Sequence, residues 1–357
     1  MTNKNNNDNN EEKYKNRRVP AEWEAYDTVM IAWPHAETDW ASMLDEIEEC
    51  YQSLARAVTQ QSGLRLLVVS PEPETVREKL GWVDPARLIV FEAPTNDTWT
   101  RDYGPISIED GGVAGVADFQ FNGWGLKFAA NLDNMVNLRM MNAGLLTRNY
   151  KPNLGFVFEG GSMESDGRGT MLTTSACLLA LNRNGAVTKE QLSDYFGRSL
   201  GMERVLFLDH GHLAGDDTDS HIDTLARLAP NDTILYVKSY RPTDSHTDEL
   251  NLMEQELAAL RTPEGKPYNL VGLPLPEAIY DDNGERLPAT YANFLITPRT
   301  VLMPTYRQPD NDRMAELMLQ TVFADREIVA VDCTALIKQH GSLHCATMQL
   351  PAGALCL

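Results

Sequence analysis

Apolar runs along the chain predict short strands that pair around tight turns and alternate with helices. The run at 28–33 predicts a buried strand, and those at 64–69 and 87–92 have the composition of two more. Between the first two strands, the segment 45–61 carries apolar side chains at helical spacing, namely Ile47, Tyr51, Leu54 and Val58. These patterns predict a mixed α/β fold from the start of the chain.

Further strand pairs follow, each split by residues that favour turns. The predicted hairpins join 105–108 to 113–118, 155–163 to 169–174, 224–228 to 233–238, and 292–296 to 300–305. Helices are predicted at 188–200, 247–260 and 311–323, before a last strand at 328–331. Thr188 and Gln191 have the spacing of a capping box at the start of the first of these helices.

The strand pairs recur at an average interval of roughly 65 residues, which is longer than the repeats of common solenoids. Five ββαβ-like units in one domain predict a propeller-like ring, in which loops from every unit converge on one axis. A doubly wound α/β sheet is the alternative topology.

Composition limits the partners and the compartment. A formal net charge of −20 disfavours nucleic-acid backbones and anionic membrane surfaces, and it favours a small cationic substrate. No run of about 18 apolar residues is present, so no membrane span is expected. The five cysteines are odd in number and scattered, which predicts a reducing, cytoplasmic location without a disulfide framework. A homo-oligomer is left open.

The N-terminal segment differs from the rest of the chain. Residues 1–18 are rich in Asn, Lys and Glu without an apolar core, so a disordered polar tail is expected there and not a signal peptide. No linker rich in Gly, Ser or Pro divides the remainder. Residues 19–357 are therefore predicted to form a single domain.

The first cluster of candidate functional residues is the loop 96–105, which follows a predicted strand and contains Trp99 and Asp102. Polar loops that follow strands often carry functional sites. The alternative interpretation is a capped loop with Trp99 in the core and Asp102 paired with Arg101.

The second cluster, 216–223, holds four aspartates and His221 within eight residues. In an extended strand, His221 and Asp223 would share one face and point toward one cavity. Two other interpretations stay open, a solvated acidic turn and a set of oxygen ligands for Ca²⁺ or Mn²⁺.

The third cluster surrounds Cys345, twelve residues from the C-terminus, with His344 adjacent. A cysteine by itself is more often a small buried hydrophobe than a nucleophile. Glu159, at a predicted strand end before Gly160 and Gly161, is a candidate supporting carboxylate.

In order and spacing, these clusters resemble those of the guanidino-group-modifying, or pentein, superfamily. Within it they are most similar to the agmatine deiminase branch of the Porphyromonas-type peptidylarginine deiminase family. The resemblance covers about residues 19–351 and rests on the segments 99–105, 121–125, 158–162, 215–223 and 343–345. It implies a five-bladed ββαβ propeller with pseudo-fivefold symmetry and one catalytic domain.

The resemblance also implies roles for single residues. Cys345 is the expected nucleophile and His221 the expected general acid and base. Asp102 and Asp223 are expected to clamp a guanidinium group beside Trp99, with Glu159 in support, and neither a metal nor an organic cofactor is implied. The chain departs from the family at 339–342, where Gln-His-Gly-Ser replaces three glycines and an asparagine, and at 219–220, where Asp-Ser replaces Asn-Gly.

These residue types suit attack on a planar cation. Two carboxylates can accept the N–H groups of a guanidinium in bidentate fashion, and a thiolate can then attack its carbon. The expected reaction is hydrolysis of agmatine to N-carbamoylputrescine and ammonia through a covalent thiouronium. Asp217, with its acidic neighbours Asp216 and Asp219, favours a substrate that carries a second cation. The alternatives are a deiminase for arginine, methylated arginine or peptidyl-arginine, and a non-catalytic protein that binds a cationic ligand.

Overall fold

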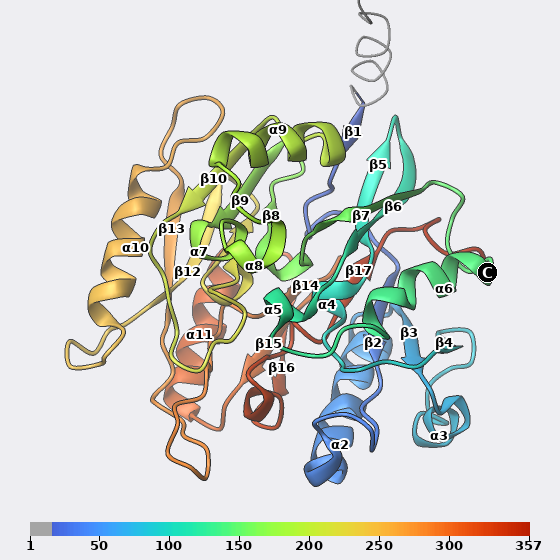
Figure 1. Ribbon diagram of the computed structural model, residues 1–357. Coiled ribbons are helices and arrows are strands. Elements are labelled where there is room, and N and C mark those ends of the chain that lie inside the picture. Colours follow the sequence, from blue (N-terminus) through green and yellow to red (C-terminus); the bar gives the residue numbers. More distant parts are fainter. Residues whose placement is uncertain (1–15) are drawn as a thin grey trace, which may run out of the picture.

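The structure, a computed structural model, describes residues 16–357, and within this part the strands form five separate sheets (Figure 1). The first contains β1 (Arg17–Arg18), β5 (Ile106–Asp110), β6 (Val113–Gln120) and β7 (Tyr150–Val157). The second contains β8 (Glu164–Ser165), β9 (Thr170–Thr174) and β10 (Arg204–Leu208). The third contains β11 (Ala226–Ala229), β12 (Thr233–Lys238) and β13 (Asn269–Pro274). The fourth contains β14 (Leu295–Ile296), β15 (Thr300–Thr305) and β16 (Glu327–Asp332).

The fifth sheet joins the two ends of the chain. Its strand order is β17 (Met348–Leu350), β2 (Thr28–Ala32), β3 (Arg65–Ser70) and β4 (Leu88–Glu92). All five sheets repeat one topology, in which an antiparallel pair is followed by a parallel strand. A single doubly wound sheet is therefore ruled out, and the five predicted ββ-containing units are present.

The longer helices connect strands within these units and lie on the outside of the molecule, as α2, α9 and α10 show in Figure 1. They are α2 (Leu44–Arg56), α3 (Pro73–Lys79), α6 (Val136–Asn142), α9 (Lys189–Leu200), α10 (Thr247–Ala259) and α11 (Pro309–Val322). Thr188 and Gln191 form the predicted capping box at the start of α9. Four short helices complete the set: α4 (Thr100–Tyr103), α5 (Gly123–Leu126), α7 (Ser175–Leu178) and α8 (Leu181–Asn184).

Helices also link neighbouring units. The helix α10 contacts β10 of the preceding sheet, α11 contacts β13, and α2 contacts β16. The short helix α8 likewise contacts β7. Each of these helices thus packs on the last strand of the unit before its own, and α10 and α11 also pack on strands of their own units.

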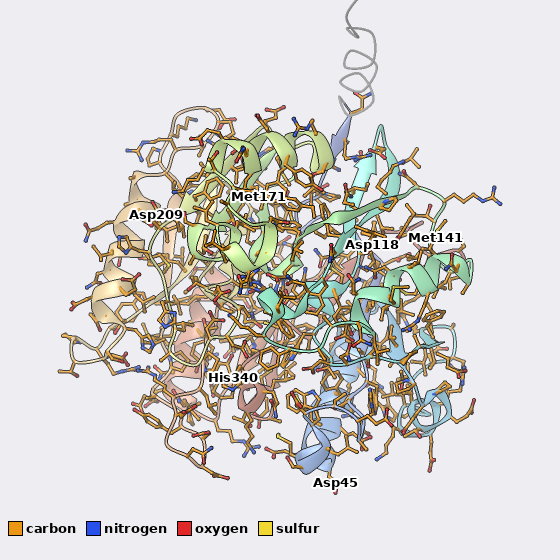
Figure 2. The ribbon with its side chains drawn as sticks, viewed as in Figure 1. Asp45, Asp118, Met141, Met171, Asp209 and His340 are labelled. Carbon is orange, nitrogen blue, oxygen red and sulfur yellow. The ribbon has the colours of Figure 1, made fainter. Side chains whose placement is uncertain are left out.

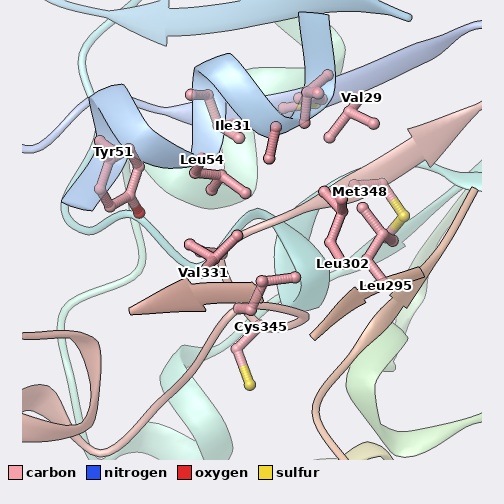
Figure 3. Close-up of a cluster of buried hydrophobic side chains, with 14 of the residues drawn as sticks. Val29, Ile31, Tyr51, Leu54, Leu295, Leu302, Val331, Cys345 and Met348 are labelled. Atoms are coloured by element: carbon pink, nitrogen blue, oxygen red, sulfur yellow. The ribbon is translucent and has the colours of Figure 1, made fainter. Parts of the chain in front are cut away.

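The sheets and helices bury a large apolar core. Strands β2 and β3 contribute side chains on both faces, which is expected where a parallel sheet is covered on both sides. Figure 2 shows Met171 and Asp118 within the molecule and Asp45 and Asp209 at its surface. In Figure 3, Cys345 lies at the edge of the cluster formed by Val29, Leu302 and Met348, with its sulfur directed away from these side chains.

Two predictions from the sequence are corrected. Residues 155–163 were expected to form one strand of a hairpin with 169–174, but Val157 ends β7, which pairs with β6, and the partner of β9 is the two-residue β8. The physical reason is that Gly160 and Gly161 form a 3₁₀ turn that breaks the run. The second correction concerns the end of the predicted tail, 1–18, most of which lies outside the described residues. Arg17 and Arg18 form the short strand β1, which pairs with β5.

No helix in the described part, residues 16–357, is long and apolar enough to span a bilayer.

Candidate active site

The candidate site residues come from equivalent places in the five units. Each lies in the connection between the last strand of one sheet and the first strand of the next. These connections carry Trp99 and Asp102, Glu159, His221 and Asp223, Asn293, and Cys345. The repeated topology therefore supplies one loop from every unit to a common region, as loops do at the axis of a ring of similar units.

The loops around Cys345 and Asp102 are joined directly, although they lie more than 240 residues apart. The Arg101 backbone N–H donates to the Cys345 carbonyl at 3.1 Å, and the Thr100 hydroxyl donates to the Ala346 carbonyl at 3.0 Å. The predicted alternative, in which Asp102 pairs with Arg101, is wrong, because Arg101 faces the His344 carbonyl and Glu22 instead.

The thiol of Cys345 is buried beside polar groups. Its Sγ lies 3.2 Å from Asn293 Nδ2 and 3.8 Å from Asp223 Oδ2. Burial raises the pKa of this thiol well above its usual range, and the Asp223 and Asp102 carboxylates raise it further. In the absence of a bound cation, Cys345 is therefore a neutral thiol at neutral pH.

His221 is held between two carboxylates. Its Nε2 lies 2.9 Å from Glu159 Oε2, and its Nδ1 lies 3.4 Å from Asp102 Oδ1. Burial alone would lower the pKa of His221, but the negative charge of Asp102 and the contacts with Cys177 and Glu159 raise it well above 6.5. The ring therefore carries a proton on each nitrogen at neutral pH.

Glu159 connects His221 to a buried arginine. The Arg183 Nε donates to both Glu159 oxygens, at 3.0 and 2.9 Å, and Arg183 Nη1 donates to Asp219 at 2.6 Å. Burial would raise the pKa of Glu159, but His221 and Arg183 lower it overall. Glu159 is thus an ionised acceptor that fixes the orientation of the imidazole.

Asp102 points into the same space. Its Oδ1 accepts the Gly161 backbone N–H at 2.9 Å, and its Oδ2 accepts the Trp124 indole N–H at 2.9 Å. Burial raises the pKa of Asp102 to about 6, although the nearby His221 charge acts in the opposite direction. Burial therefore destabilises the ionised form of this carboxylate even though the charged His221 ring is nearby, and a further cation in the pocket would offset the cost.

Asp223 has one oxygen occupied and one free. Its Oδ2 accepts from His344 Nδ1 at 2.7 Å and from Asn293 Nδ2 at 3.3 Å. Its Oδ1 is buried and has no hydrogen-bond partner among the described residues. A buried acceptor without a partner is costly, and a ligand with N–H groups would satisfy it.

A pocket of about 650 Å³, open space at its mouth included, leads to this group. Trp99 forms part of its wall and packs on Trp40 with ring centroids 5.7 Å apart. A Cβ at Gly341 would lie 2.3 Å from the Trp99 ring, so only glycine lets the indole lie where it does. Among residues 16–357, four aspartates line the pocket and no lysine or arginine does. The aspartates are Asp39, Asp97, Asp102 and Asp217.

The segment 221–223 is not the extended strand expected from the sequence. Ile222–Thr224 form a 3₁₀ turn, and Asp219 and Ser220 adopt left-handed backbone angles with φ of 66° and 64°. The Ser220 N–H donates to Asp216 Oδ2 at 2.6 Å, and Asp219 pairs with Arg183 and Lys127, which holds this backbone in place. His221 and Asp223 still face one region, although by a different local geometry.

The alternative of a metal site formed by residues 216–223 is not supported. Asp216 and Asp219 are engaged by groups of the protein, as just described. Within the described residues, Glu159, Cys177 and His221 bring three potential ligand atoms within 4.8 Å of one another. Arg183 already occupies both oxygens of Glu159, so a cation there would meet an arginine.

Sequence reasoning missed four residues that contact the site. Asn293 and Arg183 carry no local signal, because a lone polar residue near a strand is common in any chain. His344 was noted beside Cys345 but had been given no role. Trp124 lay within a segment that carried the family resemblance but had been given no role. A left-handed backbone at Trp124, with φ of 53°, turns its indole toward Asp102.

A cysteine, a protonated imidazole and paired carboxylates beside a pocket lined by four aspartates are the features of hydrolases that attack carbon–nitrogen bonds of guanidino and amidino groups. The chain belongs to the family described as Porphyromonas-type peptidyl-arginine deiminase, whose model matches residues 18–351. It is accordingly an enzyme of this hydrolytic class.

Individual relatives agree with this assignment. A protein of Porphyromonas gingivalis, provisionally called an arginine deiminase, is 49% identical with a TM-score of 0.89 over 95% of this chain and 100% of its own. An agmatine deiminase of C. jejuni, solved as a cysteine-to-serine variant with substrate bound, is 33% identical with a TM-score of 0.86 over 94% and 96% of the two chains. The agmatine deiminase of Pseudomonas savastanoi pv. phaseolicola is 29% identical over 94% of this chain and 95% of its own. The mixed α/β fold is that of the pentein superfamily.

Proposed function

We propose that this enzyme hydrolyses agmatine to N-carbamoylputrescine and ammonia, with Cys345 as the nucleophile. The observation that carries the proposal is the combination of a thiol, an imidazole and two carboxylates at a pocket whose lining, in the part of the chain that the structure describes, includes four aspartates and no lysine or arginine. Agmatine has a guanidinium at one end and an ammonium at the other, and both are cations. Relatives named agmatine deiminase support the same choice.

Binding is the first step. The guanidinium would donate N–H groups to Asp102 and to the unpartnered Oδ1 of Asp223. Stacking on the Trp99 face would add roughly 0.5–2 kcal/mol. The cation would also offset the negative charges that raise the pKa of Cys345, so that the thiol releases its proton to water when substrate is bound.

Chemistry follows in two halves. The Cys345 thiolate adds to the guanidinium carbon, His221 donates its Nδ1 proton to the leaving nitrogen, and the C–N bond breaks to release ammonia. This leaves an S-alkylthiouronium on Cys345. Water then adds to the same carbon while His221 takes back a proton. Collapse of the adduct forms the C=O bond, breaks the C–S bond and passes the remaining hydroxyl proton to the Cys345 sulfur, which releases the ureido product and restores the thiol. Glu159 would keep His221 in position through both halves.

The space for the leaving nitrogen lies in front of Gly161. A Cβ at this position would lie 2.6 Å from Asp102 Oδ1, 2.7 Å from His221 Nδ1 and 3.3 Å from Asp223 Oδ1. Gly161→Ala is therefore expected to lower kcat/KM for agmatine by about 10²-fold, because it displaces the groups that position the reacting nitrogen. Gly155→Ala is the matched control, since nothing lies within 4 Å of its added Cβ. Equal activity of the two variants would contradict this role.

Substrate choice depends on what the pocket offers to the end of the substrate away from the guanidinium. Asp217 lines the pocket, and burial raises the pKa of its carboxyl despite the opposing effect of His340. Asp97 also lines it, and burial raises the pKa of this group to about 7. An ammonium would stabilise both carboxylates in their charged forms, whereas the carboxylate of arginine would meet like charge.

An assay of ammonia and ureido-group formation from agmatine, arginine and peptidyl-arginine tests this assignment. Agmatine is expected to be the best substrate, and Asp217→Asn is expected to raise its KM by about tenfold, as for loss of one partly buried charge contact. The same substitution should change the KM for arginine little or lower it. Better turnover of arginine than of agmatine by the parent enzyme would favour the second candidate, an arginine deiminase, which is the provisional name of the P. gingivalis relative.

We also propose that the five units close into a five-bladed propeller over residues 19–357. The support is that α8, α10, α11 and α2 each contact the last strand of the preceding unit and that β17 pairs with β2 across the chain ends. The five inter-unit loops would then surround the pseudo-fivefold axis, where the site residues lie.

A further inference from the structure

Behind Asp223, on the side away from the pocket, lies a buried set of charged groups that the proposed mechanism does not use. It consists of His344, Glu22, Arg227 and Glu164, all of which are at most 8% exposed. Arg227 donates to Glu22 Oε1 at 2.9 Å and to Glu164 Oε1 at 2.5 Å. His344 is the member that connects this set to the site.

The two nitrogens of His344 face opposite ways. Nδ1 lies 2.7 Å from Asp223 Oδ2, and Nε2 lies 2.7 Å from Glu22 Oε2 and 3.1 Å from Arg227 Nη2. The backbone N–H of His344 donates to Asn293 Oδ1 at 2.9 Å, which fixes the base of the side chain. Because a carboxylate can only accept, the contact with Asp223 requires a proton on Nδ1.

This contact decides which oxygen of Asp223 is available. Oδ2 is occupied by His344, and Oδ1 is left buried without a partner among the described residues. Oδ1 faces the space in front of Gly161 that Asp102 Oδ1 and His221 Nδ1 also face. Rotation of the Asp223 carboxylate would break a short bond to His344, so the ring fixes the carboxylate in the orientation that suits a guanidinium.

We infer that His344 is a positioning residue that acts through Asp223, by holding Oδ2 with its Nδ1–H and thereby presenting Oδ1 to the substrate. Glu22 and Arg227 hold the other edge of the ring. This role rests on the proposed function, since it assigns to Asp223 the guanidinium end of the substrate. His344 itself does not touch the reacting atoms.

Two substitutions of similar size separate this role from a purely structural one. The side-chain amide of Asn places a nitrogen close to the position of Nδ1, whereas that of Gln reaches the position of Nε2. His344→Asn therefore keeps a donor for Asp223 and loses the contact with Glu22, and His344→Gln does the reverse. We expect His344→Gln to lower kcat/KM by about 10²-fold, and His344→Asn to stay within about tenfold of the parent.

The variants are compared by ammonia release from agmatine and by alkylation of Cys345 with 2-chloroacetamidine. In the second assay the thiolate displaces chloride and forms a thioether, and the reagent has the amidinium group without the tail of agmatine. The inference is supported if the alkylation rate falls in the order parent, His344→Asn, His344→Gln. Equal losses in both variants, or a larger loss in the Asn variant, would overturn it, because a role in the buried charge set alone predicts that result.

The two assays also separate this inference from the proposed function. If the parent enzyme is alkylated but releases no ammonia from agmatine, the substrate assignment fails and the order of alkylation rates still decides the role of His344. Thermal unfolding of each variant shows whether it folds. Should the Gln variant not fold, Glu22→Gln serves in its place, since it removes the charge behind the ring and leaves Nδ1 on Asp223. A loss within about tenfold supports the inference, and a loss of about 10²-fold or more overturns it.

Discussion

Cys345→Ala is expected to lower ammonia release from agmatine by at least about 10⁴-fold, the scale on which enzymes lose activity when a nucleophile is removed. Of the five cysteines, all within the described residues, Cys345 lines the pocket. The nearby Cys177 is buried behind Glu159, with its Sγ 3.6 Å from Oε2 of that residue, and it is not among the pocket-lining residues. No second thiol is placed to replace the first.

Binding should survive this substitution. Asp102, Asp223 and Trp99 keep their places, so calorimetry should detect agmatine binding to the Ala variant. Cys356→Ala is the control, because this thiol is exposed and its Sγ lies 3.7 Å from the Leu146 carbonyl, outside the pocket lining. It should retain the parent rate. Turnover by the Cys345 variant within tenfold of the parent would contradict its assignment as the nucleophile.

Asp102→Asn is expected to lower kcat/KM by about 10³-fold while stabilising the free protein above pH 6. The loss of activity follows because an amide cannot provide the charged half of a guanidinium clamp. The gain in stability follows because burial raises the pKa of Asp102 to about 6 in the folded protein, compared with a reference value of 3.8. Above pH 6 the empty site thus holds an ionised carboxylate in surroundings that disfavour its charge more than water does.

The pH dependence has a definite sign. Between pH 3.8 and about 6, the folded protein binds a proton on Asp102 that the unfolded chain has released, so this group favours folding at low pH and the benefit is lost as pH rises through that window. The difference is at most about 3 kcal/mol. Asn does not ionise, so the free energies of unfolding of parent and variant should diverge as pH rises from 4 to 7.

The measurement is denaturant unfolding of the free protein across this pH range. Asp244→Asn provides a control of opposite sign, since burial would raise the pKa of Asp244 but hydrogen bonds from Arg286 and His246 lower it overall. Its substitution should reduce stability at neutral pH. A parent and an Asp102→Asn variant with parallel pH profiles would show that Asp102 is not strained in the empty site. Agmatine should raise the melting temperature of the parent and have little effect on that of the Asn variant.

Local pattern was sufficient for most of the elements. The strand at 28–32, the hairpin turns at 111–112 and 230–232, and the capping box of α9 depend on neighbours within a few residues, so composition and spacing predict them. The failures occurred where glycines or long-range contacts override the pattern. The expected strand at 155–163 was broken by a turn at Gly160, and the expected strand at His221 was replaced by a turn that Thr218 and Asp216 cap.

By itself, the sequence determined which reactive groups are present and in what order along the chain, and this order carried the family resemblance. Only the tertiary structure decided that Asn293 and His344 belong with them. The bonds from Asn293 to Cys345 and from His344 to Asp223 span 52 and 121 positions, far beyond any helical or strand period. Tertiary structure also set the charge states. Burial raises the pKa values of Cys345 and Asp102, and neighbouring acidic groups raise that of His221 against the effect of burial. An unfolded chain has neither the burial nor these short distances between charges.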